Sequence, residues 1–215
     1  MSSCAKCNSK PCRSGKVEGA LPDCPNLKYS PESLFALYSE AEKYSALQSA
    51  TTEREGYCKD TRIEEIMDYA YKMHYKHLGL AFCVGLSSEA KIVSEIFQAN
   101  GFDIDSVCCK CGMISKEVLG ITRDEFVRPQ NEYEGMCNPI GQAKILDDLS
   151  VDFVILLGLC VGHDTLFIKH VEAPCTVLAV KDRAMGNNPL AAIYTANNYS
   201  GRVYSYIEKK YGHKK

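Results

Sequence analysis

The chain has no long apolar run and no block of like charge, and each absence excludes a class of function. Its longest apolar run, near 153–162, is far shorter than the roughly 20 residues that cross a bilayer. The start, Met1–Cys4, has no apolar stretch of the signal-peptide kind. The formal net charge is −2, and only a short basic tail within 209–215 stands out, which we predict to be solvated. We therefore predict a cytoplasmic protein that binds neither a membrane nor a nucleic acid.

Cysteine is abundant instead, with 12 in 215 residues. A chain of this length can bury a hydrophobic core and does not need disulfides to fold. In a reducing compartment so many cysteines point to bound metal, an iron–sulfur cluster or catalytic thiols.

Apolar runs that alternate with helical patterns predict the fold of residues 30–215. Strands are expected near 78–83, 103–109, 151–159 and 176–181. Helices are expected from Ser30 to before Thr51, from Thr61, from Ser87, from Pro139, after Pro189 and over 202–211. This alternation predicts an α/β domain of the Rossmann-like three-layer type, a mostly parallel sheet with helices on both faces and a helical lead-in over 30–76.

Residues 1–29 form a separate cysteine-rich segment that has almost no apolar periodicity. Its four cysteines are Cys4, Cys7, Cys12 and Cys24, with Pro25 after the last. Four thiolates suit a structural zinc site, whose binding energy would also fold the segment. The Cys24-Pro25 pair also resembles the end of bacterial ferredoxin motifs, so an iron–sulfur cluster is the alternative to Zn²⁺ in this metal knuckle.

A second set of cysteines falls at the ends of predicted elements. Cys83 and Cys160 each begin a Cys-Val-Gly tripeptide after a strand, Cys109 ends another strand, and Cys137 precedes a helix. The carboxyl ends of parallel strands meet at one edge of a sheet, and a helix start lowers thiol pKa values. We predict that these four cysteines bind a [4Fe-4S] cluster, with Zn²⁺ as the alternative. The glycines would let backbone amides reach the sulfurs.

The remaining cysteines have weaker assignments. Successive side chains of a strand face opposite ways, so only one of Cys108 and Cys109 can ligate; we favour Cys109, with Cys108 as the alternate. Cys108 and Cys111 have the spacing of a redox pair. Cys58 and Cys175 are expected to pack as small apolar residues.

Polar residues beside the second set supply candidate chemistry. His163 and Asp164 follow Cys160 closely and are the best acid–base candidates, although His163 also fits a ligand or a donor to sulfur, and Asp164 also fits a helix cap. Lys181-Asp182-Arg183 follows a strand and suits either an anionic substrate or a solvated loop. Asn187-Asn188-Pro189 is expected to line the same crevice, at the carboxyl ends of the strands.

Several segments together resemble a family of uncharacterised conserved prokaryotic proteins described as predicted metal-binding proteins, a domain of unknown function. The resemblance rests on the N-terminal cysteines and on the segments 81–86, 108–110, 137–140, 158–164, 180–183 and 188–192. It implies metal binding and no particular reaction. Cys111 and Cys175 lie outside the family pattern.

The sequence thus predicts a metal-binding protein with two cysteine-ligated sites. The second site would support redox or sulfur-transfer chemistry on a small-molecule substrate. The alternatives are a non-catalytic module for zinc sensing, metal trafficking or assembly, and a metal-free thiol redox protein that uses Cys108 and Cys111.

Overall fold

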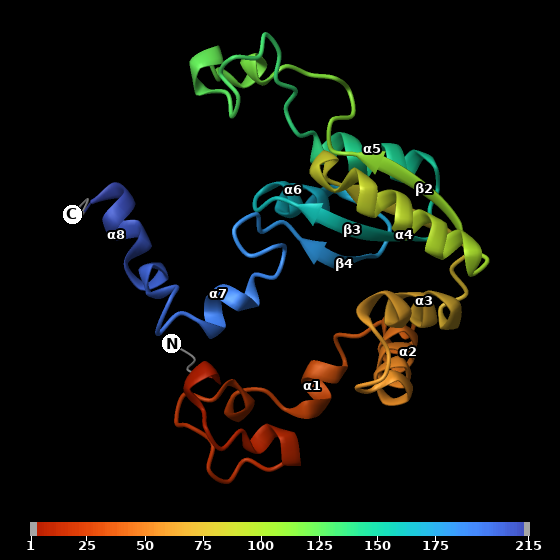
Figure 1. Cartoon of the computed structure of the whole chain (residues 1–215). Helices are drawn as coiled ribbons and strands as arrows, with labels where there is room; N and C mark the ends of the chain where they lie inside the picture. The colour runs from red at the N-terminus through yellow and green to blue at the C-terminus, as the bar shows by residue number, and fades with distance from the viewer. Residues whose placement is uncertain (1–3, 213–215) are drawn as a thin grey trace. The chain divides into compact units, whose positions relative to one another are not determined.

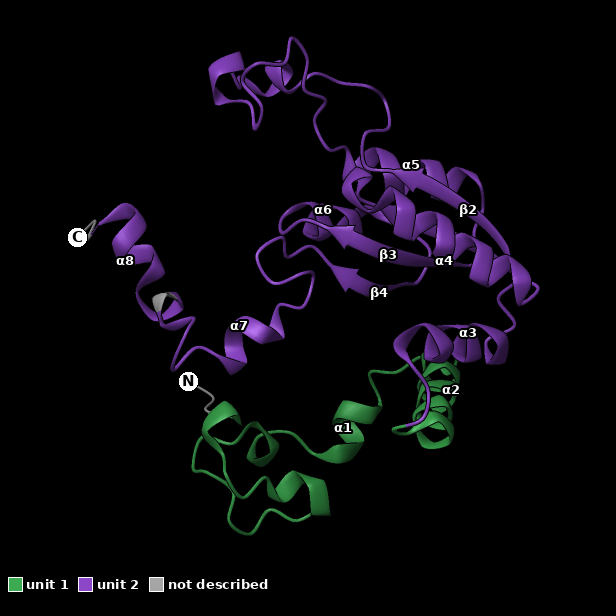
Figure 2. Cartoon of the chain, in the orientation of Figure 1, with its two compact units in different colours: residues 1–58 green, residues 59–215 purple. Residues whose placement is uncertain are grey.

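The computed structural model describes residues 4–212, except for the side chain of Arg202. Met1 and the last two lysines of the basic tail, Lys214 and Lys215, lie outside the described residues. The chain divides into two compact units, residues 1–58 and residues 59–215 (Figure 2). Each unit is described by itself below.

The first unit contains short 3-10 turns and two helices, α1 (Pro31–Phe35) and α2 (Glu40–Gly56). The prediction of one helix from Ser30 was wrong, because Ser39 starts a second helix. Its hydroxyl accepts a hydrogen bond from the Glu42 amide at 3.3 Å, while the Glu42 carboxylate accepts one from the Ser39 amide at 2.7 Å. This reciprocal cap carries α2 through Thr51 and beyond, where we had predicted its end.

The second unit is built on one four-stranded sheet whose neighbouring strands all run parallel (Figure 1). The strands are β1 (His77–Phe82), β2 (Asp103–Cys108), β3 (Phe153–Leu159) and β4 (Cys175–Val180). Their spatial order is β2-β1-β3-β4.

Helices cover both faces of this sheet, which confirms the predicted three-layer α/β fold. The helices of the unit are α3 (Arg62–Lys72), α4 (Ser87–Ala99), α5 (Pro139–Asp148), α6 (His163–His170), α7 (Leu190–Tyr194) and α8 (Tyr206–Tyr211). Helices α3 and α4 pack against one face through Leu80 and Ile155. Helices α5 and α6 pack against the other through Ala81 and Val154, since successive strand residues face opposite sides.

The strand order places a topological switch point between β1 and β3. The chain leaves β1 through α4 toward β2, and it leaves β3 through α6 toward β4, on the other side of the sheet. The crossover helices diverge there and leave a crevice at the carboxyl ends, where open α/β sheets bind ligands. Cys83 and Cys160 are the first residues after these two strands.

Among residues 4–212, the helices are all too short or too polar to cross a membrane.

Candidate functional site

Three thiols meet at the carboxyl edge of the sheet, and we call Cys83, Cys109 and Cys137 the thiol cluster. Cys83 follows β1, Cys109 follows β2, and Cys137 lies just before α5. The sulfurs of Cys109 and Cys137 are 3.8 Å apart, and the Cys109 thiol is also hydrogen-bonded to Cys83. Cys109 is the centre of the cluster and is 2% exposed.

Backbone amides from the Cys-Val-Gly turn reach these sulfurs, as predicted. The Val84 amide donates to the Cys109 sulfur at 3.3 Å, and the Gly85 amide donates to the Cys83 sulfur. The Cys109 backbone is itself held by its neighbours, because its amide donates to the Phe82 carbonyl at 2.9 Å. The turn after β1 therefore both shapes the cluster and supplies donors to its sulfurs.

A long loop that is closed at its base brings Cys137 back to Cys109. Residues 112–136 contain two 3-10 turns, Lys116–Leu119 and Arg123–Glu125. An antiparallel bridge between Ser115 and Gly135 and an ion pair between Lys116 and Glu134 close its base. Beyond that base the Asn138 amide donates to the Cys109 carbonyl at 2.8 Å. This backbone pairing thus brings the two thiols together although they are far apart in the sequence.

The thiols of the cluster differ strongly in acidity. Hydrogen bonding from Cys109 lowers the pKa of Cys83 to about 5, with help from the Gly85 amide and the positive charges of Lys181 and Arg183. Cys109 likewise lowers the pKa of Cys137 to about 5, assisted by Lys110, whose ammonium is 3.5 Å from that sulfur, and by His163. The pKa of Cys109 is raised by its hydrogen bonds with Cys137 and Cys83 and by burial of the side chain. The outer two thiols of the cluster are therefore more acidic than the central one.

These pKa values predict the alkylation behaviour of the reduced, metal-free protein. Only thiolates react rapidly, so Cys83 and Cys137 should be labelled by iodoacetamide at pH 6–7, with rates that fall as the pH drops through about 5. Cys175, whose burial raises its pKa, should stay unlabelled over that range. Mass spectrometry of peptides labelled for short times at each pH measures this. Labelling of Cys175 at the same rate as Cys83 would contradict the assignment.

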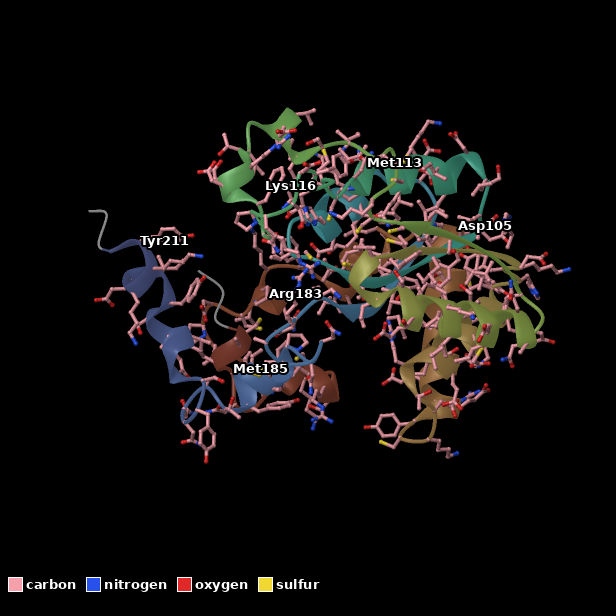
Figure 3. The ribbon with its side chains drawn as sticks, turned by 45° about the horizontal axis from the view of Figure 1, so that its top comes forward. Asp105, Met113, Lys116, Arg183, Met185 and Tyr211 are labelled. Atoms are coloured by element: carbon pink, nitrogen blue, oxygen red, sulfur yellow. The ribbon has the colours of Figure 1, made fainter. Side chains whose placement is uncertain are left out.

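The fourth predicted ligand, Cys160, is held by an arginine instead of by another thiol. The guanidinium of Arg183, which Figure 3 labels in the segment after β4, donates through Nη2 to the Cys160 sulfur at 3.5 Å. The pKa of Arg183 is raised by this contact and by the charges of Cys160, Cys83 and Cys137. Arg183 is therefore the link between Cys160 and the thiol cluster.

The acid–base candidates lie beside the cluster at the start of α6. His163 is near enough for its charge to lower the pKa of Cys137. The Asp164 carboxylate accepts a hydrogen bond from the neighbouring Thr165 amide at 2.7 Å, a local contact at the helix start. A catalytic role for either residue stays a prediction.

The other cysteines separate clearly from the cluster. Cys108 is the last residue of β2 and is half-buried, whereas Cys109, the next residue, belongs to the thiol cluster. The Cys111 thiol donates to the Asn138 carbonyl at 3.5 Å, and burial raises its pKa. Cys175 packs against the α5–α6 side of the core, as predicted. Cys58 is exposed, so its predicted packing role was wrong; it lies in the turn after α2, with φ +56°, instead of joining a core.

Sequence reasoning missed two residues that shape the site. Lys110 donates to the Gly135 carbonyl and to the Cys137 sulfur, and its position directly after Cys109 was the available signal. Gln142 on α5 is fully buried, and its amide nitrogen donates to the carbonyls of Val107 at 2.7 Å and Phe82 at 3.2 Å. It ties α5 to the last residues of β1 and β2. A glutamine on an otherwise apolar helix face was the signal for this role.

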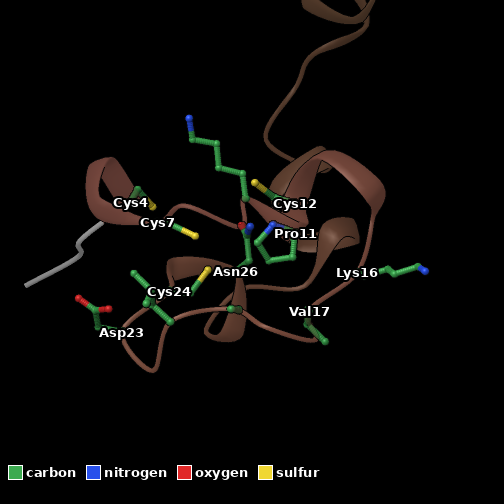
Figure 4. Close-up of a pocket in the computed structure, with 12 residues that line it drawn as sticks. Cys4, Cys7, Pro11, Cys12, Lys16, Val17, Asp23, Cys24 and Asn26 are labelled. Carbon is green, nitrogen blue, oxygen red and sulfur yellow. The ribbon is translucent and has the colours of Figure 1, made fainter.

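The four N-terminal cysteines also lie together. Cys4, Cys7, Cys12 and Cys24 line one cavity of about 60 Å³, and Figure 4 shows their sulfurs directed toward a common space. The rest of the lining includes apolar side chains such as Val17 and Leu21. The spacing of these cysteines in the sequence thus becomes one cluster in the first unit.

Neither cysteine cluster has the arrangement of a closed coordination shell. Within the described range 4–212, no group of three or more Cys, His, Asp or Glu side chains is positioned to hold a metal ion. The second cluster is a hydrogen-bonded chain with Cys109 in the middle, so its outer thiols are joined only through that residue. Metal ligation at either cluster stays a prediction.

Comparison with known proteins places the chain. A family model described as "Protein of unknown function (DUF1847)" matches residues 24–178, a range that includes the whole thiol cluster and Cys160. An uncharacterized protein of Methanocaldococcus jannaschii, MJ0455, is 42% identical over 193 residues, which cover 89% of this chain and 93% of the relative. No solved structure matches the chain. The predicted resemblance to an uncharacterised family is confirmed: the chain belongs to the DUF1847 family of proteins of unknown function.

Proposed function

We propose that the thiol cluster holds a single metal ion, preferably Zn²⁺, and that this centre acts on a small-molecule substrate. Cys83, Cys109 and Cys137 are the proposed ligands. The observation that carries the proposal is that Cys109 contacts both Cys83 and Cys137 at the carboxyl ends of β1 and β2.

The sulfur–sulfur distance favours one shared ion over a cluster. Two sulfurs each about 2.3 Å from one tetrahedral zinc ion lie about 3.8 Å apart. The sulfurs of Cys109 and Cys137 are 3.8 Å apart. In a [4Fe-4S] cluster each thiolate binds a different iron, which spaces the sulfurs more widely. The geometry therefore favours zinc, the alternative in the sequence analysis, over the iron–sulfur cluster expected there.

The charges of the site suit a cation with thiolate ligands. The lowered pKa values of Cys83 and Cys137 favour their thiolates, and the raised pKa of Cys109 favours retention of a proton in the cluster. A metal ion would take the place of that proton, because a coordinating thiol is deprotonated. The amides of Val84 and Gly85 then remain as donors to ligand sulfurs.

The contact between Arg183 and Cys160 leaves one coordination position for a substrate. Catalytic zinc sites have three protein ligands and an open position, and structural sites are closed. Because Arg183 already engages the Cys160 sulfur, we assign three ligands and an open centre. A zinc ion there would polarise a bound water or substrate oxygen. In this proposal His163 is the nearby group that moves a proton.

For the four N-terminal cysteines we propose a structural metal ion, Zn²⁺ or an iron–sulfur cluster. The support is that residues 4–51 contain no buried residue, so apolar packing cannot fold them. We place the protein in the cytoplasm, where its twelve free cysteines would stay reduced.

Metal analysis of anaerobically purified protein tests the proposal. We expect two metal equivalents per chain, no acid-labile sulfide at the second site and retention of its metal in Cys160→Ser. Iron with stoichiometric sulfide and a visible absorption band that disappears in Cys83→Ser would replace zinc by an iron–sulfur cluster. Loss of the metal from Cys160→Ser would instead indicate a closed four-thiolate site and a non-catalytic module.

A further inference from the structure

A pocket opens beside the thiol cluster, between the turn after β1 and the loop after β4. It has a volume of about 430 Å³, and its lining includes Cys83, Lys181 and Arg183. Pockets for small ligands are typically about 300–1,000 Å³. The pocket thus has room for a small molecule in reach of a cluster sulfur.

Two cations face this pocket without a carboxylate partner in the described part of the chain. The Lys181 ammonium lies against the backbone at the strand ends, since a Cβ added at Gly85 would be 3.8 Å from it and one at Gly158 only 3.4 Å. Arg183 uses one nitrogen for the Cys160 sulfur. A guanidinium has five N–H donors, so the others are available to a ligand.

The other residues that line the pocket leave room for a negatively charged ligand. Gly85 and Gly186 present backbone without side chains. The one carboxylate in the lining, Asp182, is already engaged, because its Oδ1 accepts hydrogen bonds from the amides of Ala184 and Met185 at 3.0 Å each. Asn187 uses its Oδ1 to accept from the Asp182 amide at 3.1 Å, which leaves its side-chain N–H groups for a ligand.

We infer that this pocket binds a small anion, whose carboxylate or phosphate group is held by Lys181 and Arg183 next to the thiol cluster. The inference deepens the proposed function, on which it rests for the adjacent metal, by naming the substrate class. A planar acid group can take two parallel hydrogen bonds from Arg183 and a third from the Lys181 ammonium. The rest of the molecule would then extend toward Cys83.

Calorimetric titration of the metal-loaded full chain tests the pocket. The probes are malonate and inorganic phosphate, with malonamide as the uncharged control, at constant ionic strength. We expect binding of at least one anion, and no binding of malonamide. The anion that binds more tightly identifies the acid group. Lys181→Gln and Arg183→Gln should each weaken binding by about tenfold or more.

Two controls separate charge from fold. Lys181→Arg keeps the charge and should retain binding, and Lys169→Gln removes one exposed positive charge at the far end of α6 and should leave it unchanged. The metal content of every sample is measured separately, so failure of the metal proposal is recognised independently. Wild-type protein that binds neither anion, or anion binding that survives in both glutamine variants, would overturn the inference. The inference would also be overturned if removal of the two charges changed only the metal content and no anion binding was seen.

Discussion

Cys109→Ser should lose one of the two bound metal equivalents. Among the described residues, Cys109 alone is hydrogen-bonded to both other thiols of the cluster, so its replacement leaves Cys83 and Cys137 without their link. A serine hydroxyl is a poor ligand for a soft metal site, and the loss should be essentially complete after dialysis. Metal analysis by mass spectrometry, combined with circular dichroism to confirm folding, measures the result.

The neighbouring cysteine provides a matched control. Cys108→Ser changes the same atoms one residue earlier, at a half-buried thiol that is not part of the cluster, and should keep both metal equivalents. Equal metal loss from both variants would show that the defect is in β2 and not in ligation. Full metal content in Cys109→Ser would refute the ligand set, because no other described thiol bridges Cys83 and Cys137.

Removal of the N-terminal metal should unfold residues 4–29 and leave the second unit folded. Metal binding contributes about 10 kcal/mol or more to folding in small thiolate sites. In this segment no buried residue is present to replace that contribution, whereas the second unit packs two apolar clusters against its sheet. A chelator should therefore make trypsin cleavage after Arg13 and Lys16 faster by orders of magnitude. Timed digestion with mass spectrometry detects these cuts.

Cleavage sites in the second unit serve as the internal control of the same digestion. Sites in the second unit, such as Lys76 directly before β1, should remain slow to cleave after chelation because the β1 backbone is paired on both sides. A Cys7→Ser, Cys24→Ser double variant should be cleaved rapidly even with metal present. Protection of Arg13 that does not depend on metal would mean that something other than a metal ion folds the segment.

The elements of the second unit could be predicted because their signals are local. The apolar run of β3 is buried at every position, and a strand that is covered on both faces is typically a continuous apolar run in the sequence. At the start of α3 the Thr61 amide and hydroxyl both donate to the Glu64 carboxylate, a contact made within one turn. The first unit was harder because the Ser39 cap interrupts an apolar pattern that continues from α1 into α2.

The contacts that build the site could not be predicted in the same way. The return of Cys137 to Cys109 depends on a bridge between Ser115 and Gly135, residues 20 positions apart with no periodic pattern between them. The engagement of Cys160 by Arg183 depends on the course of the loop after β4. Such contacts follow from how the backbone folds back, and apolar periodicity carries no information about them.

The sequence by itself determined the class of this protein: an α/β sheet with cysteines at the carboxyl ends of its strands and a cysteine-rich N-terminal segment with no core. It could do so because periodicity and strand ends depend on near neighbours. Only the tertiary structure decided that Cys83, Cys109 and Cys137 meet while Cys160 is held by Arg183, and that Lys181 faces the same pocket. The reason is physical: strand order sets the switch point, and the strand order depends on pairing between residues far apart in the sequence.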